Sequence, residues 1–302
     1  MESLLEALKK GRINEGQTIN DNGYFDTYKD NIFGGKMETR FQEMFDEGSG
    51  GELHSKAEAV HSSSMLSYNF FHWIDENHTF TWKNIEYNQV LFEVKMKTIK
   101  GSNAPACMDV VLIDKKKENL LFIESKFTEY TEAKKFKLSE SYRDSNKWFY
   151  DKEKINWNEI INYATAASKE KNYNEGIKQI ITHLFGIHNL LYVKGHNIKV
   201  KDKKEENIAS ANIKFFTLVF EPKVSKFEQE HKNYANYNNL FIPFRNNLEK
   251  LKKVGGLSVI PEWLSYSDLW NDMKEQIPSK ELKNFLWERY MQFAELKNHK
   301  TL

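Results

Sequence analysis

The sequence contains a single cysteine, Cys107, among its 302 residues. One cysteine excludes an intramolecular disulfide and a cysteine-rich zinc site, and it is typical of a protein from a reducing compartment. No hydrophobic run approaches the length of a membrane span, and the N-terminal MESLLEALKK carries acidic residues among its leucines, unlike a signal peptide. We therefore expect a cytoplasmic protein that does not interact with a membrane.

The sequence also lacks an excess of charge of either sign. Its 44 Lys and Arg residues nearly balance 43 Asp and Glu residues, which gives a formal net charge of +1. A polyanion must therefore be bound by a local patch, because the overall field does not attract it. No zinc-finger, helix-turn-helix or Walker pattern is present, so no recognition sequence follows from a motif. The hydrophobic fraction of 40% is typical of a soluble globular protein.

What the sequence does contain is a succession of patterns typical of an α/β fold. Helical spacing of apolar residues predicts three N-terminal helices, at Ser3–Lys10, Met37–Phe45 and Ser55–Ile74. Strand patterns follow at 87–99, 108–114, 119–127 and 212–222, with helical patterns before the last one and after it. This order predicts a mixed central β-sheet flanked by helices.

The same patterns divide the chain into three predicted segments. Residues 1–50 form an N-terminal helical extension, residues 51–224 form the core, and residues 225–302 form a mainly helical C-terminal extension packed on the core. Residues of about 131–156 are charged and aromatic without a clear period, which indicates a surface insertion in the core.

The strand pattern NLLFIESKF, at 119–127, carries two charges where a core strand would carry aliphatic residues. Alternate residues of a strand share a face, so Glu124 and Lys126 lie on the same side as Phe122. Both faces are otherwise apolar. A Glu/Lys pair on a strand is usually a solvated salt bridge, but these neighbours favour a site placed inside the protein.

The preceding strand pattern completes a hairpin that brings a second acid to this position. Centring the hairpin on Lys116 and Lys117 places Asp109 opposite Glu124, with Cβ atoms roughly 4.5 to 5.5 Å apart. Like charges directly opposite one another destabilise a sheet unless a cation lies between them or a proton is shared. Mg²⁺ suits such a pair, because it is typically held by one or two carboxylates. Two acids and a lysine therefore predict hydrolysis of phosphodiesters.

These residues resemble the active-site hairpin of the PD-(D/E)XK nuclease superfamily, which has the restriction endonuclease-like fold. The resembling segments are ACMDVVLID, at 106–114, and LLFIESKFTEY, at 120–130. More narrowly, the chain resembles a bacterial branch of restriction endonucleases through four scattered motifs: GSGGEL at 48–53, SSSMLSYNFF at 62–71, ESKFTEY at 124–130 and KQIITHLFGI at 178–187. The resemblance extends over roughly residues 48–270, where it includes the segments LVFEP and SYSDLW.

The resemblance implies a role for each residue of the hairpin. Asp109 and Glu124 are metal ligands for Mg²⁺, with Mn²⁺ able to substitute, and Lys126 is the catalytic lysine. Met108 stands where the superfamily name has proline, a position at which proline is often absent. A fourth acid is expected either at Glu93, on the strand before, or at Glu58, on the predicted serine-containing helix. We favour Glu93 as a further metal ligand and catalytic residue.

Two other groups are candidates for contacts with the substrate. Gln179 and His183 share a helix face that the resemblance puts beside the site, where Gln179 can bond a phosphate or the attacking water. The alternative is a surface amide and a satisfied histidine. Three serines, at Ser62, Ser63 and Ser64, either donate to phosphates or allow their helix to pack closely. The lysines at 115–117 and between 194 and 204, with the aromatic residues between 148 and 157, are either DNA contacts or part of a solvated face.

Together these observations predict a Mg²⁺-dependent endonuclease that acts on double-stranded DNA as a restriction or defence enzyme. A homodimer and a DNA methyltransferase partner are further expectations. The alternatives are a DNA-binding or scaffold protein with little catalysis, and a nuclease that acts on RNA or on repair intermediates. Cleavage of plasmid DNA and of a panel of substrates separates these hypotheses.

Overall fold

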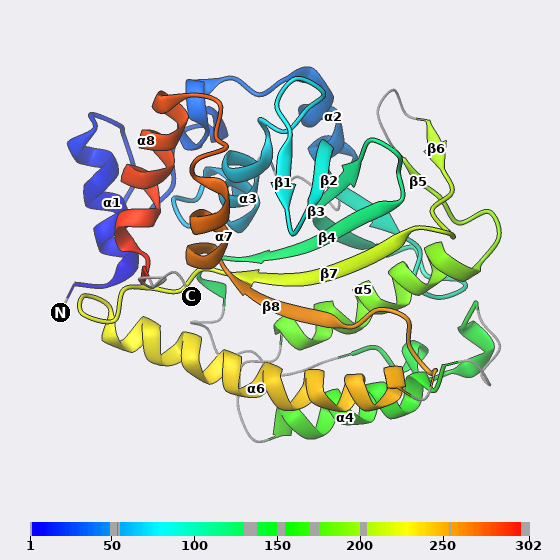
Figure 1. Ribbon diagram of the computed structural model, residues 1–302. Helices are drawn as coiled ribbons and strands as arrows, with labels where there is room; N and C mark the ends of the chain where they lie inside the picture. The colour runs from blue at the N-terminus through cyan, green and yellow to red at the C-terminus, as the bar shows by residue number, and fades with distance from the viewer. Residues whose placement is uncertain are drawn as a thin grey trace.

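The computed structural model describes residues 2–48, 53, 55–129, 138–149, 155–169, 175–199, 204–253 and 255–296. Its centre is a six-stranded mixed sheet in the order β1-β2-β3-β4-β7-β8 (Figure 1). The strands are β1 (Phe80–Trp82), β2 (Ile85–Met96), β3 (Ala106–Asp114), β4 (Asn119–Lys126), β7 (Asn212–Val219) and β8 (Pro261–Ser265). The first four are antiparallel, whereas β7 pairs with β4 and β8 with β7 in parallel. A separate hairpin pairs β5 (Ile198–Lys199) with β6 (Glu205–Glu206).

Helices cover both faces of this sheet, which confirms the predicted α/β class with a mixed sheet flanked by helices (Figure 1). The layer that we call the α3 layer contains α1 (Leu4–Asn14), α2 (Thr39–Glu47), α3 (Ser63–Phe71), α7 (Tyr266–Met273) and α8 (Lys280–Arg289). The opposite α5 layer contains α4 (Trp157–Lys169), α5 (Glu175–Tyr192) and α6 (Glu228–Lys253). Each layer forms its own hydrophobic cluster with one face of the sheet. Among the helices in the described ranges, none is both long and apolar enough to cross a bilayer.

Helices from the two ends of the chain meet in the α3 layer. Arg12 on α1 is buried and donates a hydrogen bond of 2.9 Å to the carbonyl of Arg289. Asn69 on α3 donates to the hydroxyl of Tyr290 at 2.9 Å. Residues of α1, α3 and α8 therefore belong to one hydrophobic cluster. The bounds of the three predicted segments remain a prediction.

The serine-containing helix α3 is shorter than the sequence pattern predicts. It begins at Ser63, because the hydroxyl of Ser62 accepts the N–H of Met65 and caps it. Upstream, the side-chain amide of Asn31 donates to the carbonyls of Ala57 and Ala59, at 2.8 and 2.7 Å. These bonds use backbone acceptors that a continuous helix would need. The predicted helix over Ser55–Ile74 is therefore wrong at both ends, since α3 ends at Phe71.

Strand β2 changes the face that its side chains present at Glu93. Phe92 packs in the α3 layer, and Val94 and Met96 pack in the α5 layer. Strict alternation would place all three on one face, as the sequence pattern indicates. Glu93 interrupts the alternation because its φ is +51°, a left-handed conformation that is uncommon for residues other than glycine.

Strand β3 changes face at the neighbouring position, Asp109. Met108 packs in the α5 layer and Val110 in the α3 layer. The ladder between the strands pairs Phe92 with Val110 and Val94 with Met108, so Glu93 and Asp109 lie beside each other at the irregularity. A paired distortion of two strands thus places two acidic residues where the regular sheet is interrupted.

The predicted surface insertion at 131–156 is described only in part, because 131–137 and 150–154 lie outside the described residues. Within it, Trp148 is buried and its indole donates to the carbonyl of Tyr142 at 2.9 Å. Trp157 is also buried, and its ring stacks on Phe185 with centroids 3.8 Å apart. Trp148 and Trp157 are therefore core residues, and the interpretation of these two as nucleic-acid contacts is wrong.

Candidate active site

The hairpin of β3 and β4 has the predicted register. Val110 lies opposite Ile123, and the pairing continues from there toward the turn. One position beyond that pair, the Oδ2 of Asp109 accepts the backbone N–H of Ser125 at 2.6 Å. Asp109 thus reaches across to the segment of β4 that carries Glu124 and Lys126.

Glu124 is held between two nitrogen groups from different parts of the fold. Its Oε1 accepts a hydrogen bond of 2.5 Å from the ammonium of Lys126, on the same face of β4. Its Oε2 lies 2.7 Å from the Nε2 of His183, on α5. Only 1% of Glu124 and 5% of Lys126 are exposed, so this ion pair is not the solvated salt bridge of the alternative interpretation. The structure thus brings His183 to the predicted site.

Burial and charge act in opposition on Glu124 and Lys126. Burial by itself raises the pKa of Glu124, but Lys126 and His183 outweigh it and hold this pKa at about 2. Burial lowers the pKa of Lys126, but Glu124, Glu129 and Asp109 raise it above its ordinary value. Glu124 is therefore a carboxylate and Lys126 an ammonium at neutral pH.

The pKa of Asp109 is shifted in the opposite direction from that of Glu124. Its side chain is only partly exposed, and burial together with the charges of Glu124 and Glu93 raises the pKa of Asp109 well above its ordinary value. The charge of Lys126 and the N–H of Ser125 oppose this rise but do not cancel it. The site therefore joins a stabilised carboxylate to one that is electrostatically unfavourable.

The two candidates for a fourth acid lie on different elements, and the choice between them as a metal ligand stays a prediction. Glu93 is 7% exposed and lies beside Asp109, whose pKa its charge raises. The chain passes close to it at Gly48, where a Cβ atom would lie 3.2 Å from the Cβ of Glu93. Glu58, in contrast, lies in a 3₁₀ turn before α3, with its carbonyl accepting the N–H of Phe25. The structure thus brings Glu93 to the carboxylate pair.

Comparison with known protein families identifies the chain. Residues 6–291 match the family described as "Restriction Endonuclease associating with ARP". The chain belongs to this restriction endonuclease family. The match includes α1 and α8, which lie outside the region over which sequence motifs showed a resemblance. Neither the curated proteins nor the solved structures include a match to this chain.

In this restriction endonuclease family member, the start of α3 is held against β4 at Ser63. The hydroxyl of Ser125 donates to the carbonyl of Ser63 at 3.2 Å, and it lies 2.7 Å from the hydroxyl of Tyr266. Ser62 caps the helix, and the carbonyl of Ser64 accepts the hydroxyl of Ser67 at 2.9 Å. These contacts support the packing interpretation, and a contact of the serines with phosphate stays a prediction.

Gln179 is the predicted residue for which the structure gives least support. It is partly exposed on α5, four residues before His183, and its carbonyl accepts the hydroxyl of Thr182 at 2.8 Å. Within the described part of the chain, no recorded hydrogen bond joins its side chain to Asp109, Glu124 or Lys126. A role for Gln179 in binding a phosphate or water stays a prediction.

Two tyrosines near the candidate active site are not singled out by any sequence pattern. Tyr266, at the start of α7, lies in the SYSDLW segment and bonds Ser125. Tyr237, on α6, is buried, and its pKa is raised by burial and by the charge of Glu124, with Lys126 opposing. No local pattern identifies Tyr237, because more than a hundred residues separate it from β4.

The oxygen ligands at the site suit a hard divalent cation. Among the residues that the structure describes, no group of three or more His, Cys, Asp and Glu side chains is arranged to hold a metal ion. Mg²⁺ typically needs only one or two carboxylates, with water and substrate oxygens as its other ligands. Asp109 and Glu124 meet that requirement, and a cation between them would offset the repulsion that raises the pKa of Asp109.

Proposed function

We propose that this member of the restriction endonuclease family hydrolyses phosphodiester bonds of double-stranded DNA with the help of Mg²⁺, through a PD-(D/E)XK site. The observation that carries the proposal is the buried ion pair of Glu124 and Lys126 beside the raised-pKa carboxyl of Asp109. Strongly perturbed acids that cluster with a buried cation are typical of catalytic sites. The family match supports a restriction-type nuclease.

Each residue has a role that follows from its charge. Asp109 and Glu124 would hold Mg²⁺, with Glu93 supporting Asp109, and the cation would polarise the phosphodiester and favour ionisation of the attacking water. Lys126 keeps its proton, because its pKa is raised, so we assign it to stabilising negative charge on the phosphate and to orienting water. It is then not the general base. His183 positions Oε2 of Glu124.

Digestion of plasmid DNA with Mg²⁺ or Mn²⁺ tests the proposal. Lys126→Ala should cut more slowly by a factor of roughly 10² or more, the usual effect of removing a positioned electrostatic or acid-base group. Lys280→Ala is the matched control, since Lys280 is exposed at the start of α8, which carries none of the proposed site residues.

The outcomes separate the proposal from its alternatives. Equal cleavage by wild type and Lys126→Ala would show that the site is misassigned. Binding of DNA without cleavage by the wild type would favour a scaffold protein, and preferential cleavage of RNA in the same assay would change the substrate.

The family description names an association with ARP, and we propose that this chain forms the same association.

A further inference from the structure

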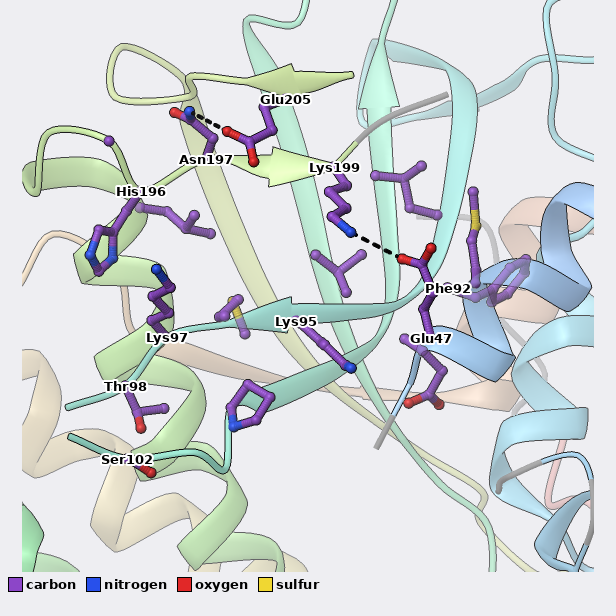
Figure 2. A pocket seen from close by; sticks show the side chains of 18 of the residues that line it. Glu47, Phe92, Lys95, Lys97, Thr98, Ser102, His196, Asn197, Lys199 and Glu205 are labelled. Atoms are coloured by element: carbon purple, nitrogen blue, oxygen red, sulfur yellow. Dashed lines mark hydrogen bonds and ion pairs between the residues drawn. The ribbon is translucent and has the colours of Figure 1, made fainter. Parts of the chain in front are cut away.

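A pocket of about 400 Å³ lies along β2 (Figure 2). Its lining comes from the end of α2, from β2, from the loop after β2, and from the segment that joins α5 to β5 and β6. Glu93 is common to the pocket and the site, because it lines the pocket and its charge raises the pKa of Asp109. A ligand in the pocket would therefore lie next to the proposed catalytic carboxylates.

One wall of the pocket is apolar and held in place by the α5 layer. Leu91, Val94 and Met96 of β2 contribute to it, together with Leu190 of α5. Met96 is tightly packed, since a Cβ atom added at Gly186 of α5 would lie 2.6 Å from its Cβ. The change of face at Glu93 is what turns Val94 and Met96 toward α5. Glu93, with its left-handed backbone conformation, thus also shapes the pocket.

Lysines supply positive charge to the pocket. Lys95 and Lys97 line the pocket and are exposed, and neither has a recorded ion pair with another residue in the described ranges. Lys199 differs, because it bonds Glu47 at 3.2 Å (Figure 2). Lys97 extends toward His196 in Figure 2, and burial together with the charge of Lys97 lowers the pKa of His196.

Three carboxylates line the pocket as well: Glu47, which Lys199 neutralises, Glu205, which accepts a hydrogen bond from Asn197, and Glu93. Beside them, the pocket offers Lys95, Lys97 and a neutral imidazole next to an apolar wall.

This combination suits a ligand that is apolar at one end and anionic at the other. Pockets of roughly 300 to 1,000 Å³ commonly bind small molecules, with apolar walls for contact area and a few polar groups for orientation. A simple track for a DNA backbone needs lysines but no apolar wall. A base that is still stacked in a duplex does not present its faces to a protein, whereas a nucleotide turned out of the stack does.

We propose that this pocket binds a single nucleotide, with its phosphate on Lys95 and Lys97 and its base against the apolar wall of β2. The source of that nucleotide is the substrate strand, turned out of the duplex beside the scissile bond. The choice of this source rests on the proposed nuclease function. Binding of a nucleotide by the pocket rests on its lining residues alone.

Calorimetric titration with the four deoxynucleoside 5′-monophosphates tests the pocket without any cleavage. A mononucleotide should bind more tightly than either the matching nucleoside or inorganic phosphate. The double variant Lys95→Ala/Lys97→Ala should weaken mononucleotide binding by about tenfold or more, because two charge-assisted contacts are lost. Both lysines are exposed, so this variant should fold like the wild type, which its melting temperature will check.

Lys226→Ala/Lys280→Ala is the matched control, because it removes the same charge from exposed positions. Lys226 precedes α6 and Lys280 begins α8, and neither helix lines the pocket. The control should bind mononucleotides like the wild type. Equal losses in both double variants, or no mononucleotide binding by the wild type, would overturn the assignment of the pocket.

Kinetics of DNA cleavage identify the source of the nucleotide. If the pocket takes a nucleotide of the substrate strand, added mononucleotide should raise KM for DNA and leave kcat unchanged. A change of kcat at constant KM would instead indicate a free nucleotide acting as an effector, and it would overturn the substrate-strand source.

The pocket and the proposed nuclease function can fail separately. Lys126→Ala should keep its mononucleotide binding, because Lys126 does not line the pocket. A wild type that binds mononucleotides but cuts no DNA would overturn the nuclease and leave the pocket standing. A wild type that cuts DNA but binds no mononucleotide would overturn the pocket and leave the nuclease standing.

Discussion

The two carboxylates at the end of the β3–β4 hairpin lie in opposite electrostatic surroundings. Glu124 is buried between Lys126 and His183, which hold its pKa at about 2 against the effect of burial. Asp109 accepts the N–H of Ser125, and burial with two neighbouring acids raises its pKa. Strand β4 therefore carries a compensated charge, and strand β3 carries one that Lys126 and the N–H of Ser125 compensate only in part.

This difference separates the part of the site that stabilises the fold from the part that is arranged for a ligand. Removing one member of a buried ion pair is strongly destabilising, because the other member stays buried without its counter-charge. Adjacent like charges cost stability, and they are typical of sites that bind something of opposite sign. We therefore expect substitutions on β4 and β3 to change stability in opposite directions.

The largest effect is expected for Glu124→Gln. The variant keeps the shape of the side chain but leaves the ammonium of Lys126 buried without a carboxylate. The free energy of unfolding at neutral pH should fall by about 3 kcal/mol, as measured by urea denaturation. Glu118→Gln, at an exposed position just before β4, is the control and should change stability by no more than about 0.5 kcal/mol.

The pH dependence of the same variant gives a second check. The folded pKa of Glu124, at about 2, lies below its unfolded value. Its contribution to stability is therefore complete above the unfolded pKa, about 4.3, and is lost as the pH falls toward the folded pKa. The stability difference between wild type and Glu124→Gln should shrink over this range. A difference that is constant from pH 7 to pH 2 would contradict the assigned ion pair.

Asp109→Asn should have a smaller effect of opposite sign. Neutralising this carboxyl removes its repulsion with Glu124 and Glu93, so the metal-free variant should be more stable than wild type by up to about 1 kcal/mol at pH 7. Because the folded pKa of Asp109 is raised, its favourable contribution is complete below the unfolded pKa and is lost as the pH rises through the folded one. The higher stability of Asp109→Asn should therefore disappear in acid.

Added Mn²⁺ should make the wild type more stable than Asp109→Asn. At ten times its dissociation constant, a bound cation stabilises the wild type by about 1.4 kcal/mol, which thermal unfolding can detect. Asp109→Asn has lost a proposed ligand and should gain less. Equal shifts of the melting temperature in the two proteins would contradict a metal site at Asp109.

The smallest effect is expected for Glu93→Gly. Glycine adopts the left-handed conformation of this position without strain and removes one acid from the neighbourhood of Asp109, which offsets the contacts that the buried Glu93 side chain loses, so stability should change by no more than roughly 0.5 kcal/mol. Lys117→Gly is the control, since Lys117 also has a positive φ, of +59°, but lies in the distant turn. Both variants should melt close to the wild type, and only Glu93→Gly should slow DNA cleavage. Unchanged cleavage by Glu93→Gly would remove Glu93 from the site.

The register of the hairpin was predictable because it is a local property. A short turn between β3 and β4 fixes which residues are opposite, and alternation then puts Glu124 and Lys126 on one face. The class of fold was predictable for a similar reason, since the order of helical and strand patterns limits the architecture. The edge strands β1 and β8 were not predicted, because segments of three and five residues carry too little periodic signal.

The sequence by itself thus determined the strand order of the hairpin, the meeting of Asp109 with β4, and the charge pattern that indicates a nuclease. Only the tertiary structure decided that His183, 59 residues from Glu124, bonds its carboxylate, and that Glu93 leaves the regular strand conformation. Those features depend on how α3 and α5 pack against the two faces of the sheet. Such packing is set by contacts between residues distant in the chain, which no local spacing encodes.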